Sequence, residues 1–125
     1  MENAEASPLA AAIVDNRIDL KARFYEYFKL VHATTEALKR EVYKLRFQVY
    51  CLETGFERKE DCQVFYENGQ EVYLETDSYD CRSDHYLIRH NRSGLYAATV
   101  RLVLPDPGNP QALFPIEEHC VLQAP

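Results

Sequence analysis

Several features are missing from the 125-residue sequence, and each absence excludes a class of protein. No stretch approaches the roughly 20 apolar residues that a transmembrane helix needs, so no membrane span is predicted. There is no basic stripe, and a formal net charge of −6 at pH 7 argues against nucleic-acid binding, which needs clustered Lys and Arg. The first residues, MENAEASPLAAAIV, carry acids where a signal peptide needs basic residues. These absences favour a cytoplasmic protein.

Cysteine is scarce and irregularly spaced. The four cysteines are Cys51, Cys62, Cys81 and Cys120. Without an export signal, this pattern favours free thiols in a reducing compartment rather than a disulfide framework. An alternative is a zinc site, because Cys and His are zinc ligands. Its candidate ligands are Cys62, Cys81, His85, His119 and Cys120. Their spacings match no ordinary zinc module, so the preferred interpretation assigns no metal.

The apolar content is sufficient for one folded domain. Hydrophobic residues make up 46% of the chain, which includes nine Tyr and six Phe, so one modest core is expected rather than two. Residues 1–16 are predicted to form a flexible arm, and residues 17–125 the domain. Within it, the apolar spacing from residue 20 to 31 favours a short helix that leads into a strand at residues 28–32.

The clearest predicted element is a helix over residues 36–53. Thr34 and Thr35 offer N-cap oxygens, and Gly55 suits a left-handed C-cap with Phe56 folded back onto the helix end. Two apolar rows at helical spacing predict burial, and they consist of Leu38, Val42, Leu45, Val49 and Leu52, and of Tyr43, Phe47 and Tyr50. Arg46 lies between the two rows, so it is predicted to point inward.

An inward guanidinium needs a paired acid, because it cannot be neutralised. The best candidates by type are Glu75, Asp77 and Asp80, in the segment LETDSYD. One alternative is that Arg46 extends to water and pairs with Glu53. Two others are that the acids form only a solvated loop, or only a charge network that braces helix and sheet.

The second half of the chain predicts a β-hairpin. Residues 57–71 are polar and predict little regular structure beyond a turn at Asn68-Gly69. Residues 85–90 and 95–104 predict two paired strands, and Arg101 is a cation within the second. Because that strand is apolar on both faces, one of its edges is expected to be open or filled by a second copy of the chain. A helix is predicted to begin at Phe114-Pro115.

Together these residues resemble a known family. EVYKLRFQVYCLE, the pattern E-x-D-x-x-D at Glu75, Asp77 and Asp80, ATVRLVLPDP and FPIEEHC are similar in order and spacing to PEP-CTERM/exosortase-associated acyltransferases. Those proteins are similar to N-acyl amino acid synthases, and the chain also resembles the N-terminal half of acyl-homoserine-lactone synthases. The resemblance covers residues 28–120 and implies an α+β GNAT-like fold, a mixed sheet flanked by helices that is incomplete at the C-terminus.

The resemblance also implies an activity and a set of site residues. The activity is transfer of a fatty acyl group from acyl-CoA or an acyl carrier protein to an amine such as an amino acid, with no bound cofactor. Glu75 is the expected general base. The residues expected to bind or wall the amine substrate are Arg46, Asp77, Asp80, Arg101, Tyr50, Phe56 and Phe114. Phe56 stands where the lactone synthases usually carry Trp, and this difference argues against their S-adenosylmethionine as the acceptor, because the aromatic wall need not have the same shape. The alternative is a non-catalytic or truncated amine-binding half-domain that needs a partner chain.

Overall fold

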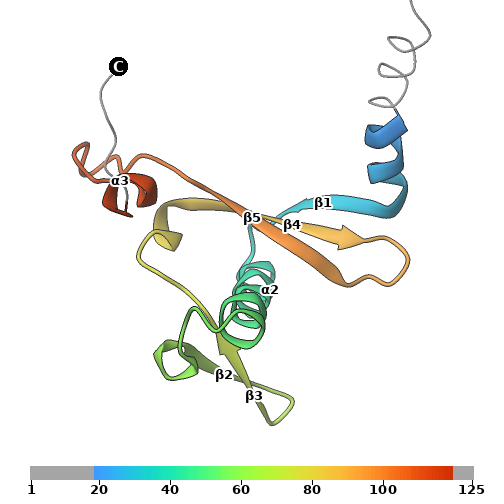
Figure 1. The fold of residues 1–125 in the computed structure, drawn as a ribbon, viewed down its shortest axis with the longest axis horizontal. Helices are drawn as coiled ribbons and strands as arrows, with labels where there is room; N and C mark the ends of the chain where they lie inside the picture. Colours follow the sequence, from blue (N-terminus) through green and yellow to red (C-terminus); the bar gives the residue numbers. More distant parts are fainter. Residues whose placement is uncertain (1–18, 120–125) are drawn as a thin grey trace, which may run out of the picture.

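The computed structural model describes residues 19–119 as an α+β domain. Residues 19–27 are helical, and β1 (Phe28–His32) follows directly, as the sequence predicts. Figure 1 shows α2 (Glu36–Phe47) between a three-stranded sheet and a separate two-stranded hairpin. The predicted arm at residues 1–16 lies outside the described residues. No helix in the described part is long and apolar enough to cross a membrane.

The central helix begins and ends where its sequence predicts. Thr35 is the N-cap, and its side-chain oxygen accepts a hydrogen bond from the Leu38 backbone N–H at 3.2 Å. The helix buries Val42 and Arg46. It continues into η2 (Gln48–Glu53), a π-helix in which the Thr54 N–H bonds the Val49 carbonyl. Gly55 then adopts a positive φ of 70°, as the left-handed C-cap predicts.

The π-helical turn changes which residues are buried at the end of this segment. Its hydrogen bonds span five residues instead of four, so each residue advances by a smaller angle and the α-helical rows do not continue. Leu52, predicted to be buried, is 68% exposed. Phe56 is 79% exposed and does not fold back onto the helix end. The prediction that Leu52 is buried was wrong for this reason, and the prediction that Phe56 packs on the helix end was wrong as well.

The sheet has the strand order β1-β4-β5 and is antiparallel throughout. Strands β4 (Ser83–His90) and β5 (Tyr96–Val103) form the predicted hairpin, with Leu87 opposite Thr99 and His85 opposite Arg101. Because opposite residues share a face, these four side chains lie on the same side of the sheet. Leu87 is fully buried and packs with Ala33 and Val42, which identifies this side as the one that α2 covers.

The segment predicted to lack regular structure is instead ordered, and that prediction was wrong. It contains η3 (Lys59–Asp61), β2 (Gln63–Glu67) and β3 (Gln70–Leu74). The two strands pair around the Asn68-Gly69 turn, which was predicted. The hairpin packs on α2 through a few aromatic side chains, although the segment as a whole is polar. Arg40 lies over the Phe65 ring at 4.8 Å, and Phe47 stacks on Tyr73.

Within residues 19–119, one face of the sheet is uncovered and neither of its outer edges, on β1 and on β5, pairs with a further strand. Val100 and Leu102, on the face away from α2, are 54% and 58% exposed. Strand β5 has β4 on one side, and no strand within the described part pairs with its other edge. This agrees with the expectation of an open edge, while pairing with a second copy stays a prediction. After η4 (Asp80–Arg82), β4 and β5, the described chain ends with α3 (Pro115–His119), close to the predicted helix start.

Candidate functional site

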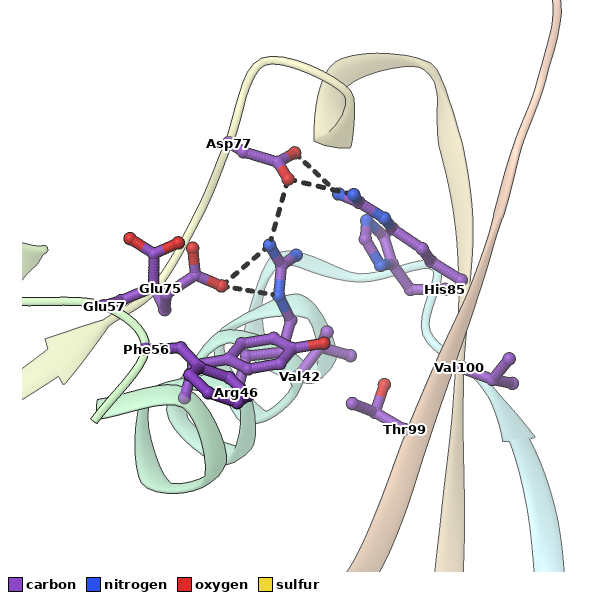
Figure 2. A pocket seen from close by; sticks show the side chains of 11 residues that line it. Val42, Arg46, Phe56, Glu57, Glu75, Asp77, His85, Thr99 and Val100 are labelled. Atoms are coloured by element: carbon purple, nitrogen blue, oxygen red, sulfur yellow. Dashed lines mark hydrogen bonds and ion pairs between the residues drawn. The ribbon is translucent and has the colours of Figure 1, made fainter. Parts of the chain in front are cut away.

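A cavity of about 300 Å³ lies between the end of α2, the segment after β3, and strands β4 and β5. Figure 2 shows the side chains that line it. Polar and charged side chains converge on this cavity from several segments of the chain, and Val42, Tyr50 and Phe56 add apolar surface. Val100 borders the cavity from β5, although its side chain points away from it (Figure 2). The lining residues are Val42, Arg46, Tyr50, Phe56, Glu57, Glu75, Asp77, His85, Thr99, Val100 and Arg101.

Arg46 is the centre of the polar cluster, as its position between the two apolar rows predicts. Its Nε donates to Glu75 Oε1 at 2.9 Å, and its Nη1 donates to Asp80 Oδ1 at 2.6 Å. Its Nη2 lies 3.6 Å from Asp77 Oδ2. Glu53 is occupied by Gln48, so the alternative pairing of Arg46 with Glu53 was wrong. The charged guanidinium of Arg46 is therefore tolerated at a buried helix position, because three acids surround it.

Arg101 approaches the same acids from strand β5. Its Nη1 donates to Asp77 Oδ1 at 2.6 Å and to Asp80 Oδ1 at 2.9 Å, and its Nη2 donates to Asp77 Oδ2 at 2.9 Å. Burial acts against the charged form of Asp77, but the hydrogen bonds and charge of Arg101 hold its pKa below the ordinary value. The two-oxygen contact fixes the orientation of Asp77.

The backbone of the acidic segment also holds its own carboxylates. Asp80 Oδ2 accepts a hydrogen bond from the Asp77 N–H at 2.7 Å, and Asp77 Oδ1 accepts one from the Tyr79 N–H at 3.0 Å. Such contacts are typical of Asp in tight turns. The segment leads into η4 at Asp80, so a local turn brings both aspartates to the arginines. The solvated-loop interpretation of these acids was therefore wrong.

Glu75 differs from the two aspartates in having an uncommitted oxygen. Its Oε1 accepts the hydrogen bond from Arg46, whereas its Oε2 accepts none from the residues that the structure describes. The residue is only 8% exposed and lines the cavity. Burial raises the pKa of the Glu75 carboxyl, and this effect exceeds the opposing one of Arg46. The free oxygen can therefore accept a proton or a hydrogen bond from a ligand.

His85 is a cavity residue that the sequence did not single out for this site. It is 1% exposed, and neither ring nitrogen has a hydrogen-bond partner in the described residues. Its Nε2 lies 3.6 Å from Asp80 Oδ1, and its ring meets Tyr43 edge to face. Burial lowers the pKa of His85, which favours the neutral imidazole. The sequence pattern that could have identified His85 is the alternation of inward and outward residues along β4, which places His85 on the same inner face as Leu87.

The predicted wall residues are only partly brought together. Tyr50 and Phe56 line the cavity on its η2 side. Phe114 does not line it; Arg82 lies over the Phe114 ring at 5.2 Å instead. Glu57 and Thr99 also line the cavity, although the sequence did not single them out. A role in substrate binding stays a prediction for each predicted residue.

The alternative metal site receives no support from the geometry. Within residues 19–119, no group of three or more Cys, His and acidic side chains is placed where it could hold a metal ion. Cys120, one of the proposed ligands, lies outside the described residues. Cys62 is instead near Cys51, with 3.6 Å between the two sulfur atoms, and both are free thiols.

Comparison with known proteins identifies a family. Residues 45–123 match the model of a family described as an acetyltransferase (GNAT) domain. The match extends over most of the chain, including the cavity residues from Arg46 to Arg101. No curated protein and no solved structure matches the sequence.

Proposed function

Because the chain belongs to the GNAT acetyltransferase domain family, we propose that it transfers an acyl group from a thioester carrier to an amine bound in the Arg46 cavity. Acyl transfer is the chemistry of the family, and acyl-CoA is its donor. The finer proposal follows the resemblance: a fatty acyl group moves from acyl-CoA or an acyl carrier protein to an amine such as an amino acid, as in N-acyl amino acid synthases and PEP-CTERM/exosortase-associated acyltransferases.

The observation that carries the proposal is the free oxygen of Glu75. An amine is mostly protonated at neutral pH, so it must lose a proton before it can attack a thioester. Glu75 Oε2 is uncommitted, the residue lines the cavity, and burial raises its pKa. A raised pKa makes a carboxylate a better proton acceptor at neutral pH. We therefore assign Glu75 as the general base.

The other charged residues have a positioning role in this proposal. Arg46 holds Glu75 Oε1, so the second oxygen faces the cavity in a fixed orientation. Asp80 accepts a hydrogen bond from Arg46 directly, and Arg101 braces the arrangement by donating to both Asp77 and Asp80. Attack forms the N–C bond and gives a tetrahedral oxyanion, for which backbone N–H groups of β5 are the proposed donors. The C–S bond then breaks, and the departing thiolate takes up the proton that the attacking nitrogen loses as it becomes an amide nitrogen.

A second candidate is a non-catalytic amine-binding half-domain that needs a partner chain. The observation in its favour is the edge of β5 that pairs with no strand in residues 19–119, since an open edge invites strand addition. In that case the cavity would bind an amine without transferring an acyl group to it.

The deciding experiment is mass-spectrometric detection of acylated products. Long-chain acyl-CoA and acyl carrier protein serve as donors against a panel of amino acids and simple amines. An acylated amine that depends on Glu75 supports the enzyme. No product under any donor, with an amine still bound, supports the half-domain.

A further inference from the structure

The cavity carries an excess of negative charge. Its wall contains the acids Glu57, Glu75 and Asp77, and Asp80 lies directly behind it. The cations among the lining residues are Arg46 and Arg101, and both pair with these acids. His85 adds no charge when it is neutral, the form that burial favours. A bound molecule therefore meets a site with a net charge of about −2 when all four acids are ionised.

Both arginines are already committed to those acids. Arg46 pairs with Glu75 and Asp80, and Arg101 takes both oxygens of Asp77. An incoming carboxylate would have to displace an internal pair to obtain a similar contact, and it would lie close to the excess acids. Like charges held together in a partly buried site are unfavourable. The arginines thus serve the protein's own acids rather than an acidic ligand.

An ammonium group, in contrast, finds an uncommitted acceptor. Glu75 lines the cavity, and its Oε2 accepts no hydrogen bond from the residues that the structure describes. Because an unsatisfied buried polar group costs free energy, a ligand that donates a hydrogen bond to this oxygen binds more tightly. The ring nitrogens of His85 also have no partner in the described part of the chain, but both are buried, with Nε2 3.6 Å from Asp80 Oδ1.

We infer that the acceptor binds as a net cation: its ammonium group donates to Glu75 Oε2, and it carries no free carboxylate. The inference rests on the proposed function, since it takes the cavity as the acceptor site. It narrows the acceptor class from amines, including amino acids, to amines whose positive charge is uncompensated. Amino-acid amides, amino-acid esters and simple alkylamines belong to this class.

A matched pair of probes tests the inference without requiring catalysis. Leucinamide and leucine differ only in the amide that replaces the carboxylate. Titration calorimetry on the full chain at pH 7 should show leucinamide binding at least about tenfold more tightly, from the repulsion between a carboxylate and the acidic excess. Equal or tighter binding of leucine, or no binding of leucinamide, would overturn the inference.

Two substitutions examine the cause of the preference. Glu57→Gln removes one exposed acid of the cavity wall and should reduce the preference by severalfold, whereas Glu60→Gln, outside the cavity, should leave it unchanged. Glu75→Gln should weaken leucinamide binding by about tenfold while thermal unfolding shows that the domain remains folded. Equal preferences in the wild type and Glu57→Gln would overturn the electrostatic argument.

Parallel acyl-transfer assays separate this inference from the proposed function. Preferential binding of leucinamide without acylation of any amine would contradict the proposed function and support the inference. Acylation of leucine in preference to leucinamide would support acyl transfer and contradict the inference.

Discussion

Replacement of Arg46 by Met should strongly destabilise the domain. Met is unbranched and fills the space of the aliphatic part of the arginine side chain, but it is shorter and provides no charge. The substitution removes the 2.9 Å hydrogen bond to Glu75 and the 2.6 Å hydrogen bond to Asp80. Asp80 keeps Arg101 as a partner at 2.9 Å, but Glu75 is left buried without a hydrogen-bonded counter-ion.

The expected loss follows from this asymmetry. Removal of one partner of a buried ion pair typically costs about 3–5 kcal/mol, because the other charge remains desolvated. We expect the lower end, about 3 kcal/mol, since Asp80 stays paired. Glu75 can also take up a proton, and its pKa is already raised by burial. Without Arg46 that pKa rises further, so the folded state binds the proton more tightly than the unfolded state does. The loss in the free energy of unfolding caused by Arg46→Met should therefore become smaller as the pH falls from 7 to 5.

Arg40→Met is the matched control, since it is the same substitution on the same helix. Arg40 lies over the Phe65 ring at 4.8 Å, a contact worth about 1 kcal/mol or less. Urea unfolding followed by circular dichroism at pH 7 and pH 5 measures both variants. Equal losses of stability in Arg46→Met and Arg40→Met would contradict this prediction, and so would a loss that is the same at both pH values. Either result would show that ion pairing with Arg46 does not stabilise the three buried acids.

Three further results are expected. Glu75→Gln should leave the fold intact and lower acyl transfer about a hundredfold or more, the usual contribution of a positioned base, whereas Glu60→Gln should not; an unchanged rate across the pH range would remove Glu75 from the mechanism. Iodoacetamide at neutral pH should label exposed Cys81 before Cys62, because burial and the neighbouring thiol raise the pKa of Cys62 to about 12; peptide mapping that finds the reverse order would contradict this. Leu102→Lys should weaken self-association through the open edge of β5 in sedimentation experiments, and a wild-type chain that is monomeric at all concentrations would refute the dimer.

The sequence predicted the elements whose own periodicity is strong. The α2 segment carries its cap, its apolar rows and its inward arginine within one run, and the β4–β5 hairpin has β-branched strands around a polar turn. The β2–β3 hairpin was missed because its strands alternate weakly. Its stability comes from α2, through contacts such as Arg40 with Phe65, which no local pattern displays.

The charged part of the site was predictable because a buried charged side chain requires a partner of opposite charge. An inward arginine requires acids, and the acidic segment was the best candidate by type. His85 was harder to identify, since a histidine in an apolar strand is compatible with ordinary packing. Its significance comes from two ring nitrogens that find no partner, a property of the folded surroundings alone.

The π-helical turn at η2 has a consequence for how the cavity tolerates changes in chain length. Arg46 lies before this turn, whereas Phe56 and Glu57 lie just after it, so the turn sets the angular offset between the two walls. A π turn contains about one residue more than an α-helical turn, so loss of one residue within Gln48–Glu53 would convert it to an ordinary α-helical turn while the chain on either side kept nearly its orientation. Loss of a second residue would rotate everything that follows by about 100° around the helix axis, and the two walls would no longer face each other. We therefore expect the Asn68-Gly69 turn to accept insertions and deletions, and this segment to accept only the loss of a single residue.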